Sequence, residues 1–431
     1  MAAKVSERRG WNSEQLTFQE SKQLLIGPAI TTVTFMRGSA TTASPVLKQR
    51  LELILSANPW LCGRLTKGVK LEYPSGTSSS HPLSDYYIES DPELNINSDM
   101  DYISICGAIA KKRSEVPSGN KCVNKNKPLI ALTIAPDSKE PNDGFAVILS
   151  ISHVIIDGFN YYQILNMLNP DSEILSLSCK RKHSIIEGNK QAMGGQEHAW
   201  ANSTAVICNV LGNMMCGSKA IVRCYEVSDQ KVKREKDNAA AHANGGFVST
   251  NDVITSMFAN AVSSDVLLMP VNFRNKLPEY NDNDAGNYEG ALVFAGSGEY
   301  GNPANIRNTL KSGPPTFLRG ADKAGNLPKG SAPLPAGFFA TKNCKLGMCT
   351  NWAFSTFQEL KLPSCEQVIH LPHTDCKMIP FDICVVFRPK ANKLAAAFFV
   401  RNIDQKGLEV ELPVGLEMSS PGQYHRETTE A

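Results

Sequence analysis

Two histidines of this sequence are followed four residues later by an aspartate. In the stretch ILSISHVIIDG, His153 is paired in this way with Asp157, and Gly158 follows the aspartate directly. A neutral imidazole accepts a proton from a hydroxyl or an amine near pH 7, so His153 is a candidate general base. Asp157 would fix the local geometry through a buried ion pair or hydrogen bond. Gly158 would allow a tight turn or a close approach by substrate.

The second pair, His81 and Asp85, lies in the polar stretch 75–85, lacks the glycine and follows no apolar run. We interpret it as part of a surface loop. His153 differs because GFAVILSIS leads into it, which places the imidazole where a buried strand opens into a turn, a common position for functional groups in α/β folds. The spacing is equally compatible with a core histidine whose nitrogens are satisfied by the backbone and by Asp157, so the pattern leaves both roles open.

The segments around this motif alternate between strand and helix patterns. Apolar runs over 129–135 and 144–153 predict central strands that are buried on both faces. Helical spacing of apolar residues predicts helices over 43–59 and 159–169. Further strands are predicted over 29–36, 60–65, 70–74, 221–227, 265–274, 290–295, 382–389 and 394–400, and a capped helix over 249–262. The predicted class is α/β with mixed sheets.

The length of 431 residues fits two domains of roughly 200 residues each. We place an N-terminal domain at 1–180 and a C-terminal domain at 219–431. Residues 181–218 have no clear period and are interpreted as a crossover linker. The Pro- and Gly-rich stretch 311–337 predicts a long mobile loop, and a polar tail is expected after the last strand.

Composition indicates the kind of partner. Hydrophobic residues make up 42% and charged residues 20%, and the net charge of +2 gives no sustained field for nucleic acid or an anionic membrane. We therefore expect a small-molecule partner. The longest apolar runs are too short to span a membrane, no secretion signal is evident, and twelve cysteines form no C-x-x-C pair. These features predict a cytoplasmic protein without a membrane span.

Four stretches resemble, in order, the motifs of one superfamily. They are NPWLCGRL (58–65), similar to an early P-L-A-G-R-L segment; SHVIIDG (152–158), similar to H-x-x-x-D-G; STNDVITSMF (249–258), similar to the helix that opens the second half; and VNFRNKLPEYNDNDAGN (271–287), similar to an N-x-R stretch followed by G-N. The chain thus resembles a divergent member of the BAHD, condensation-domain and chloramphenicol acetyltransferase superfamily.

The resemblance implies a fold and an activity. It implies two similar α/β domains with mixed sheets flanked by helices, and a solvent tunnel between them in which His153 is reached from both faces. An acyl-CoA co-substrate would enter from one side, and an acceptor with a hydroxyl or an amine from the other. No permanently bound cofactor, no metal and no covalent enzyme intermediate are expected. One tunnel in one chain makes a monomer sufficient.

The resemblance also implies roles for residues around the histidine. Asp157 would be a positioning residue, and Gly158, Asn272 and Arg274 would be structural members of the motifs. By position alone, Ser249 and Thr250 are candidates for contact with coenzyme A.

Two departures from the family pattern bear on this reading. The C-terminal D-F-G-W-G motif is absent, and 350–365 is the best candidate for the segment that leads into that region. In the family the aspartate of that motif pairs with the arginine of N-x-R, so the partner of Arg274 stays open. Ser152 stands where many carrier-dependent members have a second histidine, which favours coenzyme A donors. The alternative is a non-catalytic member that acts as a small-molecule or protein-binding module.

Three other patterns of the sequence contain residue types that could do chemistry. GSGEYG (296–301), with Asp322 further on, matches a dinucleotide-binding pattern, but no second strand follows, so we interpret it as a glycine-rich turn. HLPHTDC (370–376) and the nearby Cys365 could hold zinc, but there is no second ligand pair and a proline interrupts the segment, so no metal site is predicted. The basic clusters 179–182 and 231–236 are interpreted as solvated faces, or as contacts for the phosphates of coenzyme A.

Overall fold

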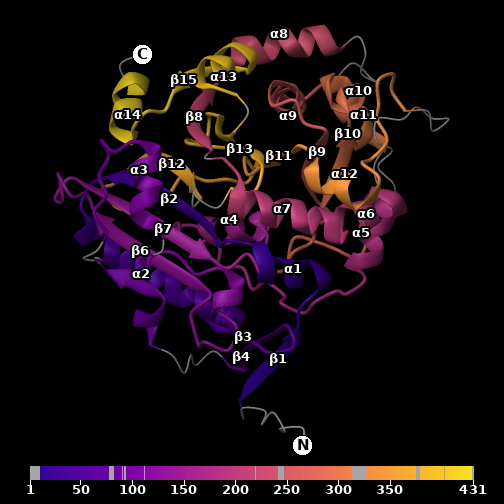
Figure 1. The fold of residues 1–431 in the computed structure, drawn as a ribbon. Helices are drawn as coiled ribbons and strands as arrows, with labels where there is room; N and C mark the ends of the chain where they lie inside the picture. Colours follow the sequence, from indigo (N-terminus) through magenta and orange to yellow (C-terminus); the bar gives the residue numbers. More distant parts are fainter. Residues whose placement is uncertain are drawn as a thin grey trace, which may run out of the picture.

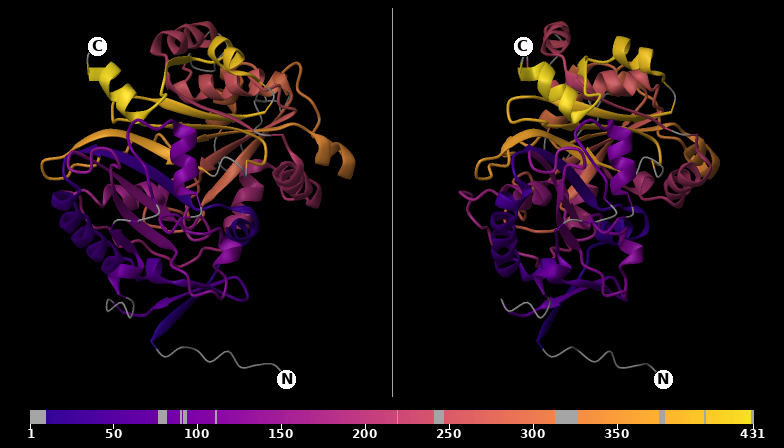
Figure 2. Two further views of the ribbon diagram at one scale, coloured as in Figure 1. Left: turned by 60° about the vertical axis from the view of Figure 1, so that its left-hand side comes forward. Right: turned by 90° about the vertical axis from the view of Figure 1, so that its left-hand side faces the viewer.

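The protein is built on two large β-sheets. The computed structural model describes residues 10–76, 82–89, 91, 94–110, 112–218, 220–240, 247–312, 327–374, 379–401 and 403–429. One sheet has five strands in the order β12-β2-β7-β6-β5, and the other has seven in the order β10-β9-β11-β13-β14-β8-β15. The N-terminal half lies below the C-terminal half in Figure 1, and both views of Figure 2 show the same arrangement.

The five-stranded sheet carries the candidate histidine. Its strands are β12 (Glu366–His373), β2 (Ile30–Arg37), β7 (Gly144–Ile151), β6 (Ile130–Pro136) and β5 (Tyr87–Glu89). Strand β7 pairs antiparallel with β2 on one side and β6 on the other, and all its residues after Gly144 are buried. The predicted central strands are confirmed. Strand β12 pairs antiparallel with β2, so a strand from the second half of the chain completes this sheet.

The seven-stranded sheet is mixed. Its strands are β10 (Glu289–Ala295), β9 (Val266–Asn272), β11 (Leu346–Asn351), β13 (Asp382–Phe387), β14 (Ala395–Val400), β8 (Ile221–Val227) and β15 (Val414–Glu417). Strand β11 pairs in parallel with β9 and β13, while β10 pairs antiparallel with β9. In the other sheet, β5 and β6 are parallel neighbours. The predicted α/β class with mixed sheets is confirmed.

A small third sheet joins β1 (Trp11–Gln15), β4 (Lys70–Pro74) and β3 (Arg64–Thr66). The strand predicted over 60–65 is wrong in its first part, because Pro59–Cys62 form a 3₁₀ helix. Proline at the start of a helical turn loses no hydrogen bond, and its fixed φ suits that position. Two more 3₁₀ helices cover Leu83–Asp85 and Gly119–Lys121.

Helices cover the sheets and connect them. They are α1 (Phe18–Ile26), α2 (Ala40–Ala57), α3 (Tyr102–Ile109), α4 (Gly158–Asn166), α5 (Ile185–Met193), α6 (Gly195–Ala201), α7 (Thr204–Cys216), α8 (Asp229–Ala240), α9 (Thr250–Ala261), α10 (Ser297–Tyr300), α11 (Pro303–Ser312), α12 (Gly337–Asn343), α13 (Gln405–Glu411) and α14 (Pro421–Thr429). The predicted helices over 43–59, 159–169 and 249–262 correspond to α2, α4 and α9.

The segment interpreted as a crossover linker, 181–218, contains the helices α5, α6 and α7, and the residues after the last predicted strand contain α13, β15 and α14. The role of 181–218 as a crossover between two domains stays a prediction. Of the predicted loop 311–337, residues 313–326 lie outside the described residues, while α11 ends at Ser312 and α12 begins at Gly337.

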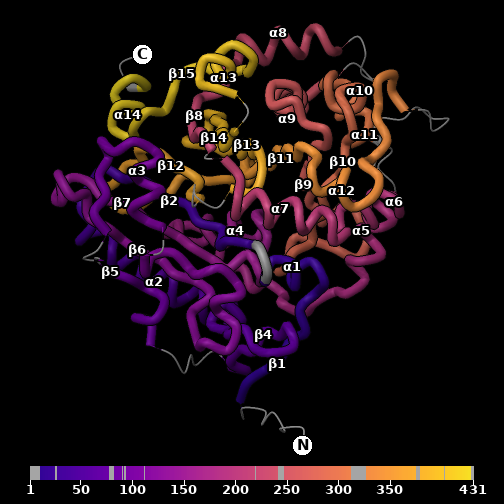
Figure 3. Tube along the Cα trace, viewed as in Figure 1, coloured from indigo at the N-terminus to yellow at the C-terminus, as the bar shows by residue number. Residues whose placement is uncertain are grey.

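An apolar cluster between the two sheets joins the halves of the chain. Val33 and Ile148 contribute from the five-stranded sheet, and Val222, Val385 and Phe399 contribute from the seven-stranded sheet. Burying such side chains contributes roughly 1.5–3 kcal/mol each, so this contact fixes how the sheets sit on one another. Helix α4 lies along this junction, as the trace in Figure 3 shows, and its Asn166 side chain donates to the carbonyl of Thr356 in the second half.

Candidate active site

His153 lies in the turn between β7 and α4, as the sequence predicts. Its Nδ1 lies 2.8 Å from the carbonyl oxygen of Ile156. A carbonyl can only accept a hydrogen bond, so Nδ1 carries the proton of the neutral ring and Nε2 keeps a free lone pair. The His153 side chain is 20% exposed, so the ring is not sealed in the core. This tautomer presents Nε2 as a base.

Asp157 begins helix α4 as its N-cap. Its Oδ1 accepts the backbone N–H of Asn160 at 3.1 Å, which satisfies one of the free donors of the first turn. Its Oδ2 accepts from Arg274 at 2.6 Å and from the backbone N–H of Tyr288 at 3.1 Å. Among the described contacts, the ring of His153 has none with Asp157. The alternative in which Asp157 forms a hydrogen bond with the His153 ring is therefore not the arrangement in the structure.

Arg274 holds the motif aspartate from the other half of the chain. Its guanidinium is buried and donates to Asp157, to the Asn160 side chain at 2.7 Å and to the carbonyls of Asp284 and Gly286. The side-chain oxygen of Asn272 accepts from the backbone N–H and from Nη1 of the same arginine. The partner of Arg274, which the sequence left open, is thus Asp157.

Two aromatic rings enclose this guanidinium. Arg274 lies over the ring of Phe159 at 5.0 Å and over the ring of Tyr288 at 5.2 Å from the centroid. A desolvated cation–π contact contributes up to about 2 kcal/mol. The rings also exclude water from the ion pair between Arg274 and Asp157.

A second buried arginine holds the other side of the histidine turn. Arg181 donates to the carbonyl of Ile155 at 3.0 Å and to that of Ala285 at 3.0 Å, and its Nε lies 2.9 Å from a carboxylate oxygen of Glu20. Both side chains of this ion pair are fully buried. The interpretation of 179–182 as a solvated face is therefore wrong at Arg181. The sequence did not indicate that Arg181 is buried, because its neighbours in the sequence are basic and polar.

Glu289 is the residue near His153 that the sequence analysis missed. It opens strand β10 opposite Asn272, and its Oε1 lies 3.9 Å from Nε2 of His153. Burial raises the pKa of its carboxyl above the ordinary value; a protonated His153 opposes this rise, Asp157 adds to it and Arg274 opposes it. The pairing of β9 with β10 and the bond from Asn287 to the His153 carbonyl bring Glu289 to the histidine, so its position in the sequence gave no signal.

Gly286 and Asn287, shortly before Glu289 in the sequence, support the turn that carries His153. Asn287 donates from its side chain to the carbonyl of His153 at 2.9 Å. Gly286 has a φ of +145°, a conformation that L-residues with a side chain rarely adopt. Gly158 has no such conformation, and a Cβ added there would meet Phe354 and Trp352 at 3.7 to 3.9 Å, which is ordinary contact. The backbone of Gly158 therefore does not require glycine, and close approach of a substrate to this position stays a prediction.

The two residues expected to contact coenzyme A lie at the start of α9. Ser249 is the N-cap, and it forms a capping box with Asp252, which in turn pairs with Arg307 at 2.6 Å. Thr250 is the first residue of the helix. Helix capping accounts for Ser249, and contact of either residue with coenzyme A stays a prediction.

The histidines of the HLPHTDC segment have protein partners. His370 is buried, with Nδ1 at 2.8 Å from the Thr34 hydroxyl and Nε2 at 3.2 Å from that of Tyr162. His373 lies 3.2 Å from Glu115. Asp375 and Cys376 lie outside the described residues. Among the residues that the structure describes, no group of three or more side chains that could hold a metal ion occurs.

The glycine-rich stretch GSGEYG has a local structural role. A Cβ at Gly298 would overlap the backbone of Gly330, so the glycines of GSGEYG allow two backbone segments to pack closely. Asp322 and His81 lie outside the described residues, and Asp85 ends a 3₁₀ helix.

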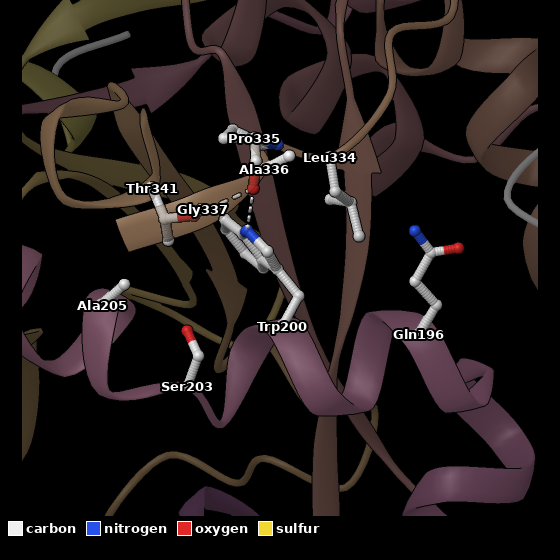
Figure 4. A pocket seen from close by; sticks show the side chains of 9 residues that line it. All are labelled: Gln196, Trp200, Ser203, Ala205, Leu334, Pro335, Ala336, Gly337 and Thr341. Atoms are coloured by element: carbon white, nitrogen blue, oxygen red, sulfur yellow. Dashed lines mark hydrogen bonds between the residues drawn. The ribbon is translucent and has the colours of Figure 1, made fainter. Parts of the chain in front are cut away.

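A cavity of about 300 Å³ lies away from the histidine, between α6, the start of α7 and the segment that leads into α12 (Figure 4). Its wall includes Trp200, whose indole N–H donates to the carbonyl of Pro335 at 3.1 Å, and Leu334. Neither His153 nor Glu289 lines it.

Solved structures with the same fold exist, although neither a protein-family model nor a curated protein matches the sequence. Vinorine synthase has 14% identity and a TM-score of 0.59, covering 94% of this chain and 95% of that one. F. graminearum TRI101, solved with coenzyme A and T-2 mycotoxin, has 15% identity and a TM-score of 0.59 over 93% and 97%. The first condensation domain of the CDA synthetase has 13% identity and a TM-score of 0.53 over 93% of each chain.

These likenesses cover nearly the whole chain and concern the fold. They confirm the fold that the predicted resemblance implies: the chain folds like vinorine synthase, TRI101 and a condensation domain. In the part of the chain that the structure describes, no helix is long and apolar enough to cross a membrane.

Proposed function

We propose that this protein is an acyltransferase that moves an acyl group from a coenzyme A thioester to a hydroxyl or amine of a small molecule, with His153 as general base. The observation that carries the proposal is the geometry of His153. Its Nδ1 is fixed by the carbonyl of Ile156, and its Nε2 lone pair is free on a partly exposed ring. In the same fold, TRI101 has been solved with coenzyme A and a small molecule together.

The proposed reaction uses Nε2 twice. The ring accepts the proton of the acceptor hydroxyl or amine as that atom attacks the thioester carbonyl, and it then protonates the leaving thiolate. The same proton thus moves from acceptor to sulfur, and no covalent bond to the enzyme forms. The solvent tunnel between the halves, implied by the family resemblance, would bring both substrates to this nitrogen.

Asp157 supports this role by position. Its oxygens are occupied by Arg274 and by backbone N–H groups, so it holds the end of the turn rather than the imidazole. Asn287 and Arg181 fix the backbone of the turn at His153 and Ile155. A ring held in this way reaches the reacting atoms with little loss of entropy on binding.

The test is turnover of acyl-CoA by the purified protein and by His153→Ala. Acetyl, malonyl, long-chain and aromatic thioesters are offered with a panel of alcohols and amines, and free thiol is measured. We expect acceptor-dependent release of thiol and a loss of about 100- to 10,000-fold in His153→Ala, the usual contribution of a general base. The matched control is His183→Ala, since His183 is exposed. Equal rates for His153→Ala and wild type would overturn the proposal, and ligand binding without any turnover would favour a non-catalytic binding protein.

A further inference from the structure

Beside the proposed base lies a carboxylate that the proposed reaction does not use. We propose that Glu289 binds the acceptor, and that this acceptor is a protonated amine, so that the product is an amide. This inference rests on the proposed function and narrows its acceptor from hydroxyl or amine to amine.

The distance between the two groups fits one bridging nitrogen. Oε1 of Glu289 lies 3.9 Å from Nε2 of His153, which is too long for a hydrogen bond between them. One atom can lie at hydrogen-bond distance, about 2.8 to 3.0 Å, from both of these acceptors. Because both groups accept, the bridging atom must carry at least two hydrogens. An ammonium or amine nitrogen meets this condition, whereas an alcohol oxygen has one hydrogen.

The charges around the site favour a cation at this position. Asp157, the other carboxylate near His153, is paired with Arg274 at 2.6 Å. Glu289 has no such partner among the described residues: its one contact with a basic side chain is the 3.9 Å approach to His153. Its side chain is 30% exposed, so a ligand can reach it. A partly desolvated carboxylate without a fixed cation attracts a cationic ligand more strongly than it would in water.

The strand pairing holds this carboxylate in place. Glu289 is in register with Asn272, whose side chain accepts a hydrogen bond from Arg274. Asn287, two residues before Glu289, donates to the carbonyl of His153. The cross-strand neighbour of Glu289 and the backbone just before it are therefore held to the histidine turn. The distance between acid and base is set by the fold.

Acylation of an ammonium requires the loss of two protons, and the site offers two acceptors for them. Glu289 takes the first proton from the ammonium and releases it to solvent, which leaves a neutral amine. The amine nitrogen attacks the thioester carbon, His153 takes the second proton, the C–S bond breaks, and His153 protonates the thiolate. The products are an amide, free coenzyme A and one proton. Burial raises the pKa of the Glu289 carboxyl, which makes it a better base for the first step.

The experiment compares matched acceptors in wild type and Glu289→Gln with acetyl-CoA and with the best donor from the thioester panel. 2-Phenylethylamine and 2-phenylethanol, and tryptamine and tryptophol, differ only in the nucleophile. We expect wild type to favour the amine of each pair, and Glu289→Gln to lower the ratio of kcat/KM for amine over alcohol about 100-fold, the scale of a lost charge pair in a binding site. The control is Glu187→Gln, since the Glu187 side chain is 77% exposed.

Two results would overturn the inference. One is a preference of wild type for the alcohols, and the other is an unchanged ratio in Glu289→Gln. If wild type turns over no acceptor, the proposed function fails, and binding decides the inference separately. Calorimetric titration with 2-phenylethylamine hydrochloride should then show binding to wild type that is at least about tenfold weaker in Glu289→Gln. Equal or absent binding in the two proteins rejects the role of Glu289.

Discussion

The ion pair between Arg274 and Asp157 is the interaction whose loss should cost the protein most. The two side chains are 0% and 1% exposed, and the guanidinium also donates to the carbonyls of Asp284 and Gly286. Arg274→Met keeps much of the volume but leaves the Asp157 carboxylate buried without a cation. Breaking a buried pair from one side costs about 3–5 kcal/mol, because desolvation of the remaining charge is no longer offset. We expect the free energy of unfolding to fall by that amount.

The measurement is the free energy of unfolding in urea, followed by circular dichroism. The matched control is Lys139→Met, which breaks the pair of Lys139 and Asp99, whose side chains are 59% and 48% exposed. An exposed pair contributes about 0–1 kcal/mol, so the two variants should differ by at least about 2 kcal/mol. If Arg274→Met loses no more than Lys139→Met, the account of this ion pair is refuted.

A double variant separates the lost attraction from the buried charge left behind. Asp157→Asn combined with Arg274→Met removes both ions of this pair, and asparagine still serves as an N-cap of α4. We expect the double variant to be more stable than Arg274→Met by about 1–2 kcal/mol. Additive losses would show that the two residues do not act as a pair.

Two further predictions concern His370 and the glycines of the site. Burial lowers the pKa of His370 to about 3, while the unfolded residue titrates near 6.5. Below about pH 6.5 the unfolded chain therefore binds a proton at His370 that the folded protein does not bind. The free energy of unfolding falls as the pH falls toward 3, and the loss is about 2 kcal/mol at pH 5. His370→Gln should reduce the difference in unfolding free energy between pH 7 and pH 5 by that amount, and an unchanged difference would contradict the assignment. Gly286→Ala should lower the free energy of unfolding by about 1–3 kcal/mol, because the φ of Gly286 is +145° and the new Cβ would lie 3.0 Å from the Tyr288 ring. Gly158→Ala should change the free energy of unfolding by less than about 1 kcal/mol. Equal losses in these two variants would contradict the roles assigned to the glycines.

The sequence predicted the part of the site that is encoded locally. Strand β7 and helix α4 each have a strong pattern over eight or nine residues, and a capping aspartate stands between them, so His153 could be placed at their junction. The helices α5 to α7 were missed because their buried positions are not a clean apolar stripe. In α5 they include Asn189, which a hydrophobic pattern does not count.

The long-range part of the site could not be predicted in the same way. Arg274 and Asp157 are separated by 117 residues, and only the contact between the two sheets brings them together. The side-chain bond between Thr34 and His370, across the pairing of β2 with β12, spans 336 residues. Local propensity carries no information on such pairs. Arg181 shows the consequence: a basic residue between two lysines looks solvated, yet it is buried because Glu20, from helix α1, supplies the opposite charge.

The way charges are distributed separates structure from chemistry in this site. Glu20 and Asp157 are each neutralised by a buried arginine, and Arg181 and Arg274 both bind backbone carbonyls between residues 284 and 286. Both arginines are thus committed to holding the histidine turn against the opposite half of the chain. The carboxylate of Glu289 is left beside the free nitrogen of His153 without a fixed cation among the described residues. Changes in either arginine should therefore act first on stability, while a change in Glu289 should act on the choice of acceptor.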